Sequence, residues 1–385
     1  MLQVRRSLFL SFLLVLLYCY SLIPTESETS TFPLIVRTSA ALAIVLVAVA
    51  NLNEVRVYYS ISVVFILVYF LVLSAISFSF RYFVNSVVVL AAFFWALAYF
   101  QSYSFRSGAT LALDMVIYGS VFFLILQFLE YYLTGKLFDY HNLFFPWSES
   151  RLPLWSSLAR VGGVYIEPGT YANWIYVLLI LRIFLEKKIG AVMVPLVAVT
   201  MMLSMSAWGV IIGLFILVAY TIRGFDYKVI LLVSVIVFGA VAGAALVDLS
   251  DVFNFLENRV FYSGSRNVRD DAFSEFIQIF PDVLIFGLGF GKVFCVDCLS
   301  PQDAGLVISL VTVYGFVFSC LFFFLIYYYA YLRGGWRLAF LCLPLLNTKL
   351  FYWDHVLWSV FMIAALGLAT LRIYPAWDFS VERNV

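Results

Sequence analysis

The sequence predicts an all-α, polytopic membrane protein with about 12 transmembrane helices and two long loops. Of its 385 residues, 64% are hydrophobic and only 12% are charged, whereas soluble globular proteins carry about 25% charged residues. Apolar runs follow one another along the chain, and only two long segments, 134–169 and 248–304, interrupt them with many charges. No other segment is long enough to form a soluble domain, so we expect residues 1–385 to form a single membrane domain.

The lengths of the apolar runs predict where the helices lie. A bilayer core of roughly 30 Å requires about 20 apolar residues per helix. The first run follows Arg5 and Arg6 and stays bulky to Ile23, which favours an uncleaved helix over a signal peptide. The short runs between 170 and 222 are also compatible with two re-entrant helices. The predicted spans are 7–23, 33–50, 57–76, 82–100, 111–133, 170–185, 189–203, 207–222, 228–247, 305–332, 337–352 and 355–373.

The distribution of charge predicts the orientation in the membrane. Short cytoplasmic loops carry an excess of Lys and Arg. The basic loops LEKKIG, TIRGFDYK and LRGGWR all fall on one side if both termini lie on that side. We therefore expect cytoplasmic termini and an outer location for 134–169 and 248–304.

The first outer segment contains a candidate functional site around Glu167. The residues Arg151 and Arg160, a Gly162-Gly163 pair and Glu167-Pro168 lie between apolar spans, where charged loops must lie in water or line a polar cavity. Pro168 biases Glu167 toward an extended backbone and suits the first turn of the next helix. A carboxylate at the mouth of a span is costly unless it is paired or functional. Two interpretations remain open, an Arg160–Glu167 pair that fixes the loop and a catalytic or binding role.

The second outer segment predicts an amphipathic helix over 267–280. Phe273, Phe276, Ile277 and Phe280 form an apolar stripe at helical spacing, and Pro281 ends it. Such a helix can lie along the membrane surface, with Arg266 and Arg269 near its start. A guanidinium suits bidentate binding of phosphate. Contacts with lipid headgroups or with the adjacent aspartates are the structural alternative.

Other sequence patterns bear on nucleotide binding, metal binding and transport. Gly287, Gly289 and Gly291 lack the preceding strand and the spacing of a nucleotide site. No His, Cys and carboxylate spacing resembles a metal cage, so we expect no metal cofactor. We also expect no nucleic-acid partner. Asp114 and Glu130 lie near opposite ends of one predicted span, and a proton relay between them is the transporter interpretation.

Four motifs follow one another over roughly 150–320. They are Arg160–Pro168, which is one residue longer than R-x-G-x-x-x-E-P, Leu203–Ser206 (L-S-x-S), Arg266 and Arg269 followed by Gly287-x-Gly289, and Asp303 opening a span that ends at Tyr314-Gly315. Their order resembles that in bacterial O-antigen polymerases, which belong to the O-antigen ligase/polymerase superfamily with a GT-C-like membrane fold. Arg151 and Gly162 also match an R-x10-G spacing of polymerase loops. Ala207-Trp208 stands where many relatives have an arginine, and no R-x10-G recurs in the second loop.

The resemblance implies a glycosyltransferase that polymerises oligosaccharide units carried on undecaprenyl diphosphate. Arg151, Arg160, Arg266 and Arg269 would bind the diphosphate, and Glu167 or Asp303 would accept the proton of the acceptor hydroxyl. Asp303, where ligases tend to place histidine, favours a polymerase over a ligase.

The resemblance also implies a location and partners. The chain would lie in the bacterial inner membrane with its active site in the periplasm, in contact with membrane lipids and a chain-length regulator protein. An O-antigen ligase or another lipid-linked polysaccharide glycosyltransferase is the first alternative. A lipid-linked oligosaccharide flippase or transporter is the second.

Overall fold

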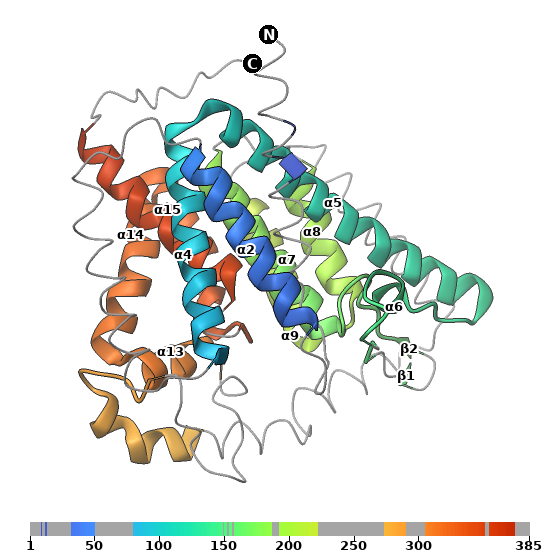
Figure 1. The fold of residues 1–385 in the computed structure, drawn as a ribbon. Helices are drawn as coiled ribbons and strands as arrows, with labels where there is room; N and C mark the ends of the chain where they lie inside the picture. Colours follow the sequence, from blue (N-terminus) through green and yellow to red (C-terminus); the bar gives the residue numbers. More distant parts are fainter. Residues whose placement is uncertain are drawn as a thin grey trace.

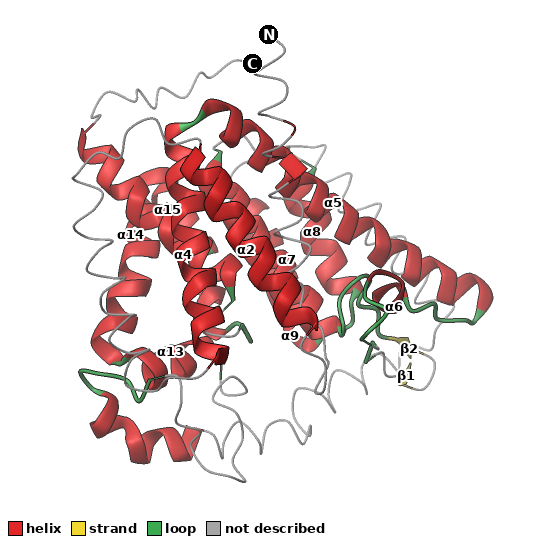
Figure 2. Cartoon of the chain, in the orientation of Figure 1, coloured by secondary structure: helices red, strands yellow, loops and turns green. Residues whose placement is uncertain are grey.

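The computed structural model describes residues 9, 12–13, 32–50, 80–148, 150–151, 154–155, 158–186, 192–221, 273–289, 305–350 and 354–373. This part of the chain is mostly helical (Figure 2). Two-residue strands β1 (Leu154–Trp155) and β2 (Leu158–Ala159) pair in an antiparallel hairpin, an addition to the all-α prediction. The main helices are α2 (Phe32–Ala50), α4 (Phe80–Gln101), α5 (Tyr103–Thr134), α6 (Tyr140–Phe144), α7 (Pro168–Leu185), α8 (Met193–Leu203), α9 (Ala207–Thr221), α13 (Leu306–Tyr314), α14 (Phe316–Leu341) and α15 (His355–Ile373).

Three of the described helices, α5, α7 and α14, are long and apolar enough to cross a membrane. Shorter apolar helices pack around them, including α8 and α9. The described residues are therefore consistent with an all-α membrane protein, while the number of twelve spans stays a prediction. The predicted spans 57–76 and 228–247, and nearly all of 7–23, lie outside the described residues.

Helix α7 forms the centre of the bundle. It packs against α5, α8, α9 and α15, and 83% of its residues are buried inside the protein. A helix buried on all sides belongs to a core rather than to a lipid-facing surface. Figure 1 shows α2 in front of α7 and α4 in front of α15, with α6 and the β1–β2 hairpin near the last turns of α5.

Local signals explain the ends of the longest helix. The Ser102 side chain accepts a hydrogen bond from the Phe105 amide at 3.3 Å, which caps the start of α5. Gly135 ends the helix in the left-handed conformation, with φ of 69°, and its N–H donates to the Tyr131 carbonyl. Hydropathy alone predicted a start at 111, whereas the helix begins at Tyr103 because capping and not apolarity fixes its first turn.

Two predicted spans near the C-terminus differ from the structure. The predicted span 305–332 is interrupted at Gly315, which has φ of 90° and lies so close to Ile285 that an added Cβ would be 2.5 Å from its carbonyl oxygen. The predicted span 337–352 is not a helix of its own. Helix α14 kinks at Gly335 and ends at Leu341, the 3-10 helix η3 (Leu343–Asn347) follows, and 348–350 is not helical.

The predicted amphipathic helix is helical over its described residues, 273–279, and continues as the 3-10 helix η1 (Phe280–Val283). Its apolar stripe divides into two parts. Phe276 packs against Phe280, which packs against Phe316 of α14, with ring centroids 5.6 and 5.7 Å apart. Phe273 and Ile277 are exposed. Arg266 and Arg269 lie outside the described residues.

Candidate functional site

Glu167 occupies the boundary between the first charged loop and the central helix. Its backbone is extended, with φ of −151° and ψ of 159°, and Pro168 begins α7 directly after it. This is the conformation that a residue before proline favours. The Glu167 side chain does not cap the helix; its Oε1 accepts a hydrogen bond from the Thr170 hydroxyl at 3.3 Å. The carboxylate is half-buried, so it lies at the edge of the bundle's core.

A turn between α8 and α9 lies beside this carboxylate. In the turn, Met205 adopts a left-handed conformation with φ of 53°, and Ser206 donates its N–H to the Ser204 hydroxyl. Gly169 separates Ser206 from Glu167. A Cβ on this glycine would lie 3.5 Å from Glu167 Oε1 and 3.8 Å from Ser206 Oγ. The structure therefore brings the Glu167-Pro168 motif and the Leu203–Ser206 motif together.

The loop before Glu167 is fixed by a buried amide from α5. Gln127 is fully buried, and its Oε1 accepts hydrogen bonds from the N–H groups of Gly162 and Gly163 at 3.0 and 2.8 Å. Its Nε2 donates to the Phe138 carbonyl at 2.7 Å. Gly163, with φ of 60°, lies so close to α5 that an added Cβ would be 3.0 Å from the Leu124 backbone nitrogen. The Gly162-Gly163 pair therefore packs directly on α5, as a tight backbone path requires.

His141 fixes the same loop from the other side. Its Nδ1 lies 2.9 Å from the Val164 carbonyl and its Nε2 lies 2.9 Å from the Ser148 hydroxyl. Because a carbonyl can only accept, Nδ1 carries a hydrogen, and in the neutral ring Nε2 accepts from Ser148. The imidazole is fully buried and Ser148 is only 2% exposed. Both groups are structural supports of the loop.

Sequence reasoning gave no role to Gln127 or His141. A lone amide inside an apolar span is a usable signal, because a polar group in hydrocarbon needs a partner. The partner of Gln127 could not be predicted from the sequence, since it is the backbone of a loop about 35 residues later.

Two of the four predicted anion-binding arginines, Arg151 and Arg160, lie in the described part of the chain. Arg151 is exposed, and its N–H donates to the Ile166 carbonyl at 2.6 Å, which places its backbone beside the residue that precedes Glu167. Arg160 is half-buried at the start of the fixed loop. Arg266, Arg269 and Asp303 lie outside the described residues, so their roles stay predictions.

The two remaining motifs contact each other. The N–H groups of Leu288 and Gly289 donate to the Thr312 and Val313 carbonyls at 2.8 and 3.2 Å. A Cβ on Gly287 would collide with the Val313 carbonyl. The Gly-x-Gly segment thus covers the last carbonyls of α13, next to Tyr314-Gly315, and its glycines allow this close approach.

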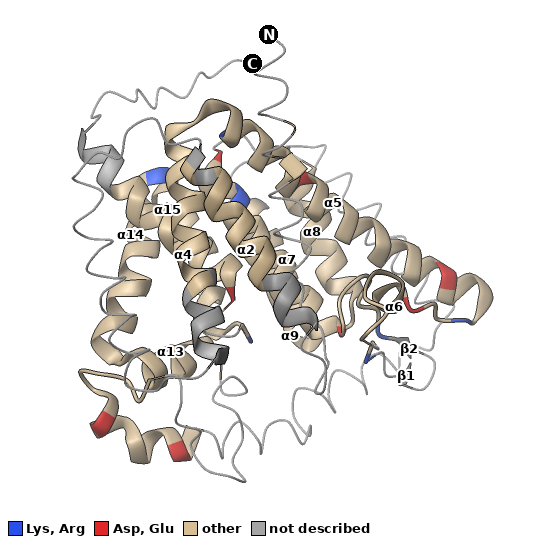
Figure 3. Ribbon diagram, viewed as in Figure 1, with Lys and Arg blue, Asp and Glu red and all other residues tan. Residues whose placement is uncertain are grey.

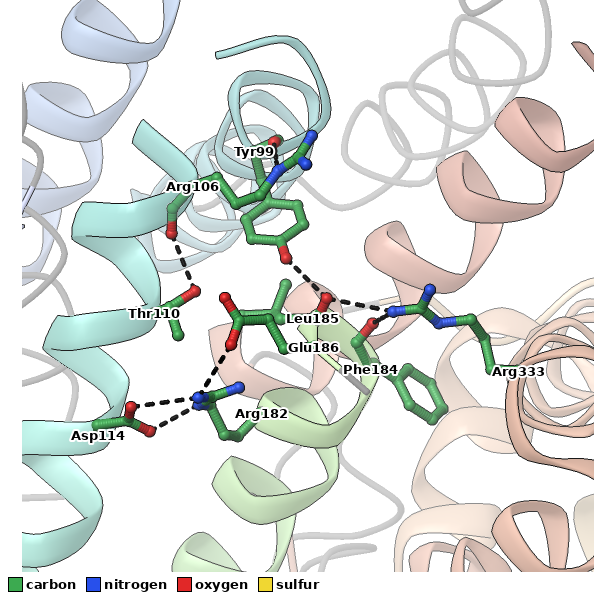
Figure 4. Close-up of polar contacts among 9 residues, drawn as sticks. All are labelled: Tyr99, Arg106, Thr110, Asp114, Arg182, Phe184, Leu185, Glu186 and Arg333. Carbon is green, nitrogen blue, oxygen red and sulfur yellow. Dashed lines mark hydrogen bonds and ion pairs between the residues drawn. The ribbon is translucent and has the colours of Figure 1, made fainter. Parts of the chain in front are cut away.

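Few charged residues lie on the described helices (Figure 3). At the end of α7 away from Glu167 lies an arginine cluster, defined here as Arg106, Arg182 and Arg333 (Figure 4). Arg182 pairs with Asp114 of α5 at 2.6 Å and with Glu186 at 3.2 Å. Arg333 donates to the Phe184 and Leu185 carbonyls at 2.9 and 3.1 Å. Arg106 and Arg333 lie between predicted spans on the side that was predicted to be cytoplasmic, and Arg182 lies in the last turn of α7.

Asp114 and Glu130, the two candidates for a proton relay, are engaged in separate contacts. Asp114 pairs with Arg182 of the arginine cluster, and Glu130 accepts a hydrogen bond from the Tyr140 hydroxyl at 3.1 Å. Burial and the Glu130 carboxylate raise the pKa of the Tyr140 hydroxyl, which therefore stays protonated and donates. The two carboxylates are separated along α5 by 16 residues, about 24 Å of helix.

Within the described ranges no group of three or more His, Cys, Asp or Glu side chains could hold a metal ion. Comparisons of the chain with models of protein families, with curated proteins and with solved structures found no match.

Proposed function

We propose that this protein is a membrane glycosyltransferase of the O-antigen polymerase type, with a GT-C-like fold. It joins oligosaccharide repeat units carried on undecaprenyl diphosphate, at the periplasmic face of a bacterial inner membrane. The growing chain leaves its lipid carrier and is transferred to a sugar hydroxyl of the next lipid-linked unit.

The observation that carries this proposal is the position of Glu167. Its carboxylate lies at the start of the most buried of the three candidate spans, beside the Ser204–Ser206 turn and after a loop that Gln127 and His141 fix. Rigid support of this kind is what a catalytic group needs, because small displacements of a reacting group are costly in rate. The contact between the Gly-x-Gly and Tyr-Gly motifs is a second observation in favour, since motifs of one site should pack together.

The proposed reaction needs few chemical groups. The acceptor hydroxyl attacks the anomeric carbon of the donor sugar, and the bond from that carbon to the phosphate oxygen breaks. The electron pair of this bond leaves with the lipid diphosphate, and the hydroxyl proton passes to Glu167 as general base. Arg160, Arg151, Arg266 and Arg269 stabilise the charge on the departing diphosphate. The predicted base Asp303 is the alternative proton acceptor.

Deletion of the gene, followed by electrophoresis of the lipopolysaccharide, tests the proposal. A lipid core that carries a single repeat unit in place of a ladder supports a polymerase. A core without antigen, while lipid-linked polymer accumulates, indicates a ligase. Loss of all outward-facing lipid-linked units indicates a flippase. An unchanged ladder would reject all three.

A further inference from the structure

A short non-helical segment interrupts the apolar sequence near the C-terminus and carries one cation, Lys349. The segment Thr348–Leu350 follows η3. At membrane depth, non-helical backbone is tolerated only where protein buries it or where it lines a water-filled cavity. Thr348 and Leu350 are fully buried, whereas Lys349 between them is exposed. The backbone is therefore covered by protein while the ammonium is left accessible.

Hydrogen bonds attach this segment to the candidate site. The Leu306 N–H donates to the Thr348 carbonyl at 2.9 Å, and the Lys349 N–H donates to Asn173 Oδ1 of α7 at 3.0 Å. Asn173 is 2% exposed, and its Nδ2 donates to the Gly169 carbonyl at 2.7 Å. One side chain thus joins the Lys349 backbone to the first turn of α7, the turn that also faces Glu167 and Ser206.

Asn173 also relates Lys349 to Glu167 along α7. Asn173 follows Glu167 by six residues, which is roughly 9 Å along a helix axis, so the Lys349 backbone is attached within the first two turns of the helix that Glu167 precedes. A lysine carries its ammonium on a flexible four-carbon stem, which lets the charge reach a substrate bound at this end of α7.

The charge of Lys349 is not neutralised within the part of the chain that the structure describes. The ion pairs found there involve Arg182 with Asp114 and Glu186, and Arg106 and Arg333 donate to backbone carbonyls. Among the described residues, the hydrogen bond of Lys349 is the one that its backbone N–H donates to Asn173, and its ammonium has no ion pair there. An ionisable residue in an apolar region that is not part of a structural pair indicates a functional site.

We infer that Lys349 binds the diphosphate of the lipid-linked substrate. The inference rests on the proposed function and adds a binding residue that no motif contains. A lysine binds phosphate as a mobile point charge and not as a rigid fork, so its ammonium can follow the diphosphate as the glycosyl bond breaks.

Binding of undecaprenyl diphosphate to the purified full-length protein in nanodiscs tests this inference. Lys349→Met keeps much of the apolar stem and removes the charge, and Lys349→Arg keeps the charge. Because the segment is attached through the Lys349 backbone N–H, both variants should fold, and thermal unfolding checks this. Lys136→Met is the matched control, since Lys136 is also exposed and lies at the end of α5.

Loss of one charged contact should weaken binding by at least roughly tenfold in Lys349→Met. Lys349→Arg should recover most of the affinity and Lys136→Met should match the wild type. Binding by Lys349→Met within twofold of the wild type would overturn the inference, as would an equal loss in Lys136→Met.

Polymerisation by the same wild-type preparation is measured in parallel, so that the two proposals can fail separately. Wild-type polymerisation together with normal binding by Lys349→Met rejects only the role of Lys349. Wild-type binding that depends on Lys349, without any polymerisation, rejects only the polymerase.

Discussion

Arg182 Nε lies 2.6 Å from Asp114 Oδ1, and this ion pair joins α7 to α5 at the end of the central helix farthest from Glu167. Arg182 is only 5% exposed. A second bond of 3.2 Å from its NH2 group to Oδ2 makes the contact bidentate, the geometry in which arginine and carboxylate interact most specifically.

Asp114→Ala should therefore destabilise the protein, because it removes the main partner of a buried guanidinium. Breaking a fully buried pair costs about 3–5 kcal/mol, and partial exposure of the Asp114 side chain reduces our expectation to about 1–3 kcal/mol. Thermal unfolding in detergent measures the loss. Glu186→Ala is the control, since its side chain is 41% exposed and should contribute less than about 1 kcal/mol. Equal losses in both variants would contradict the central role of Asp114.

Gln127→Leu should release the loop that precedes Glu167. The variant leaves the Gly162 and Gly163 N–H groups without their acceptor, at a cost of about 1–3 kcal/mol for each unsatisfied buried group. Amide hydrogen exchange should accelerate in 160–166, more than in α14. Gln278→Leu, which changes an exposed glutamine, should leave the loop unaffected. Unchanged exchange in Gln127→Leu would show that the loop is fixed by other contacts.

The predicted topology can be tested with single cysteines in a background without the native ones. Lys136→Cys should be labelled from the periplasm, and Trp336→Cys, at a position that is 78% exposed, should be labelled from the cytoplasm. Labelling of both cysteines from the same side would reject the predicted orientation.

Glu167→Gln should bind lipid-linked units normally and polymerise them at least roughly a hundredfold more slowly, the expected effect of losing a general base. Glu275→Gln, at a half-buried position, is the control and should retain activity. Near-normal turnover by Glu167→Gln would exclude Glu167 as the base, and Asp303→Asn would then be the next variant to measure.

Replacement of Arg160, Arg266 or Arg269 by lysine should keep the charge but lose the planar, bidentate guanidinium. We expect each variant to lose much of its ladder in a deletion strain, with normal membrane levels of the protein. A full ladder from all three variants would exclude the predicted contacts with diphosphate.

The sequence predicted well those features that depend on local apolarity. The observed α2, α4, α7 and α15 begin and end within about two residues of the predicted spans because each coincides with a continuous apolar run in the sequence. The break at Gly315 depends instead on its contact with Ile285, which is remote in sequence. Hydropathy cannot detect such a contact, and it therefore merged α13 with α14.

In the candidate site too, features set by adjacent residues were predicted, whereas features set by remote contacts were not. Proline after Glu167 identified the helix boundary correctly, because this preference acts between adjacent residues. Gln127 and Lys349 were overlooked because their importance comes from partners in other segments, the Gly162-Gly163 backbone and Asn173.

The burial of α7 has a consequence for how the chain enters the membrane during synthesis. Charged and polar side chains oppose the insertion of an isolated helix into the bilayer, less strongly near its ends than at its centre. Helix α7 carries Arg182 in its last turn and the buried Asn173 in its second turn. Its carboxylate partner, Asp114, belongs to α5, which is synthesised earlier and is the more apolar helix of the two. We therefore expect α5 to enter the bilayer first and α7 to pack against it on leaving the translocon. The order of synthesis would then place the Asp114 carboxylate in position before Arg182 enters the membrane.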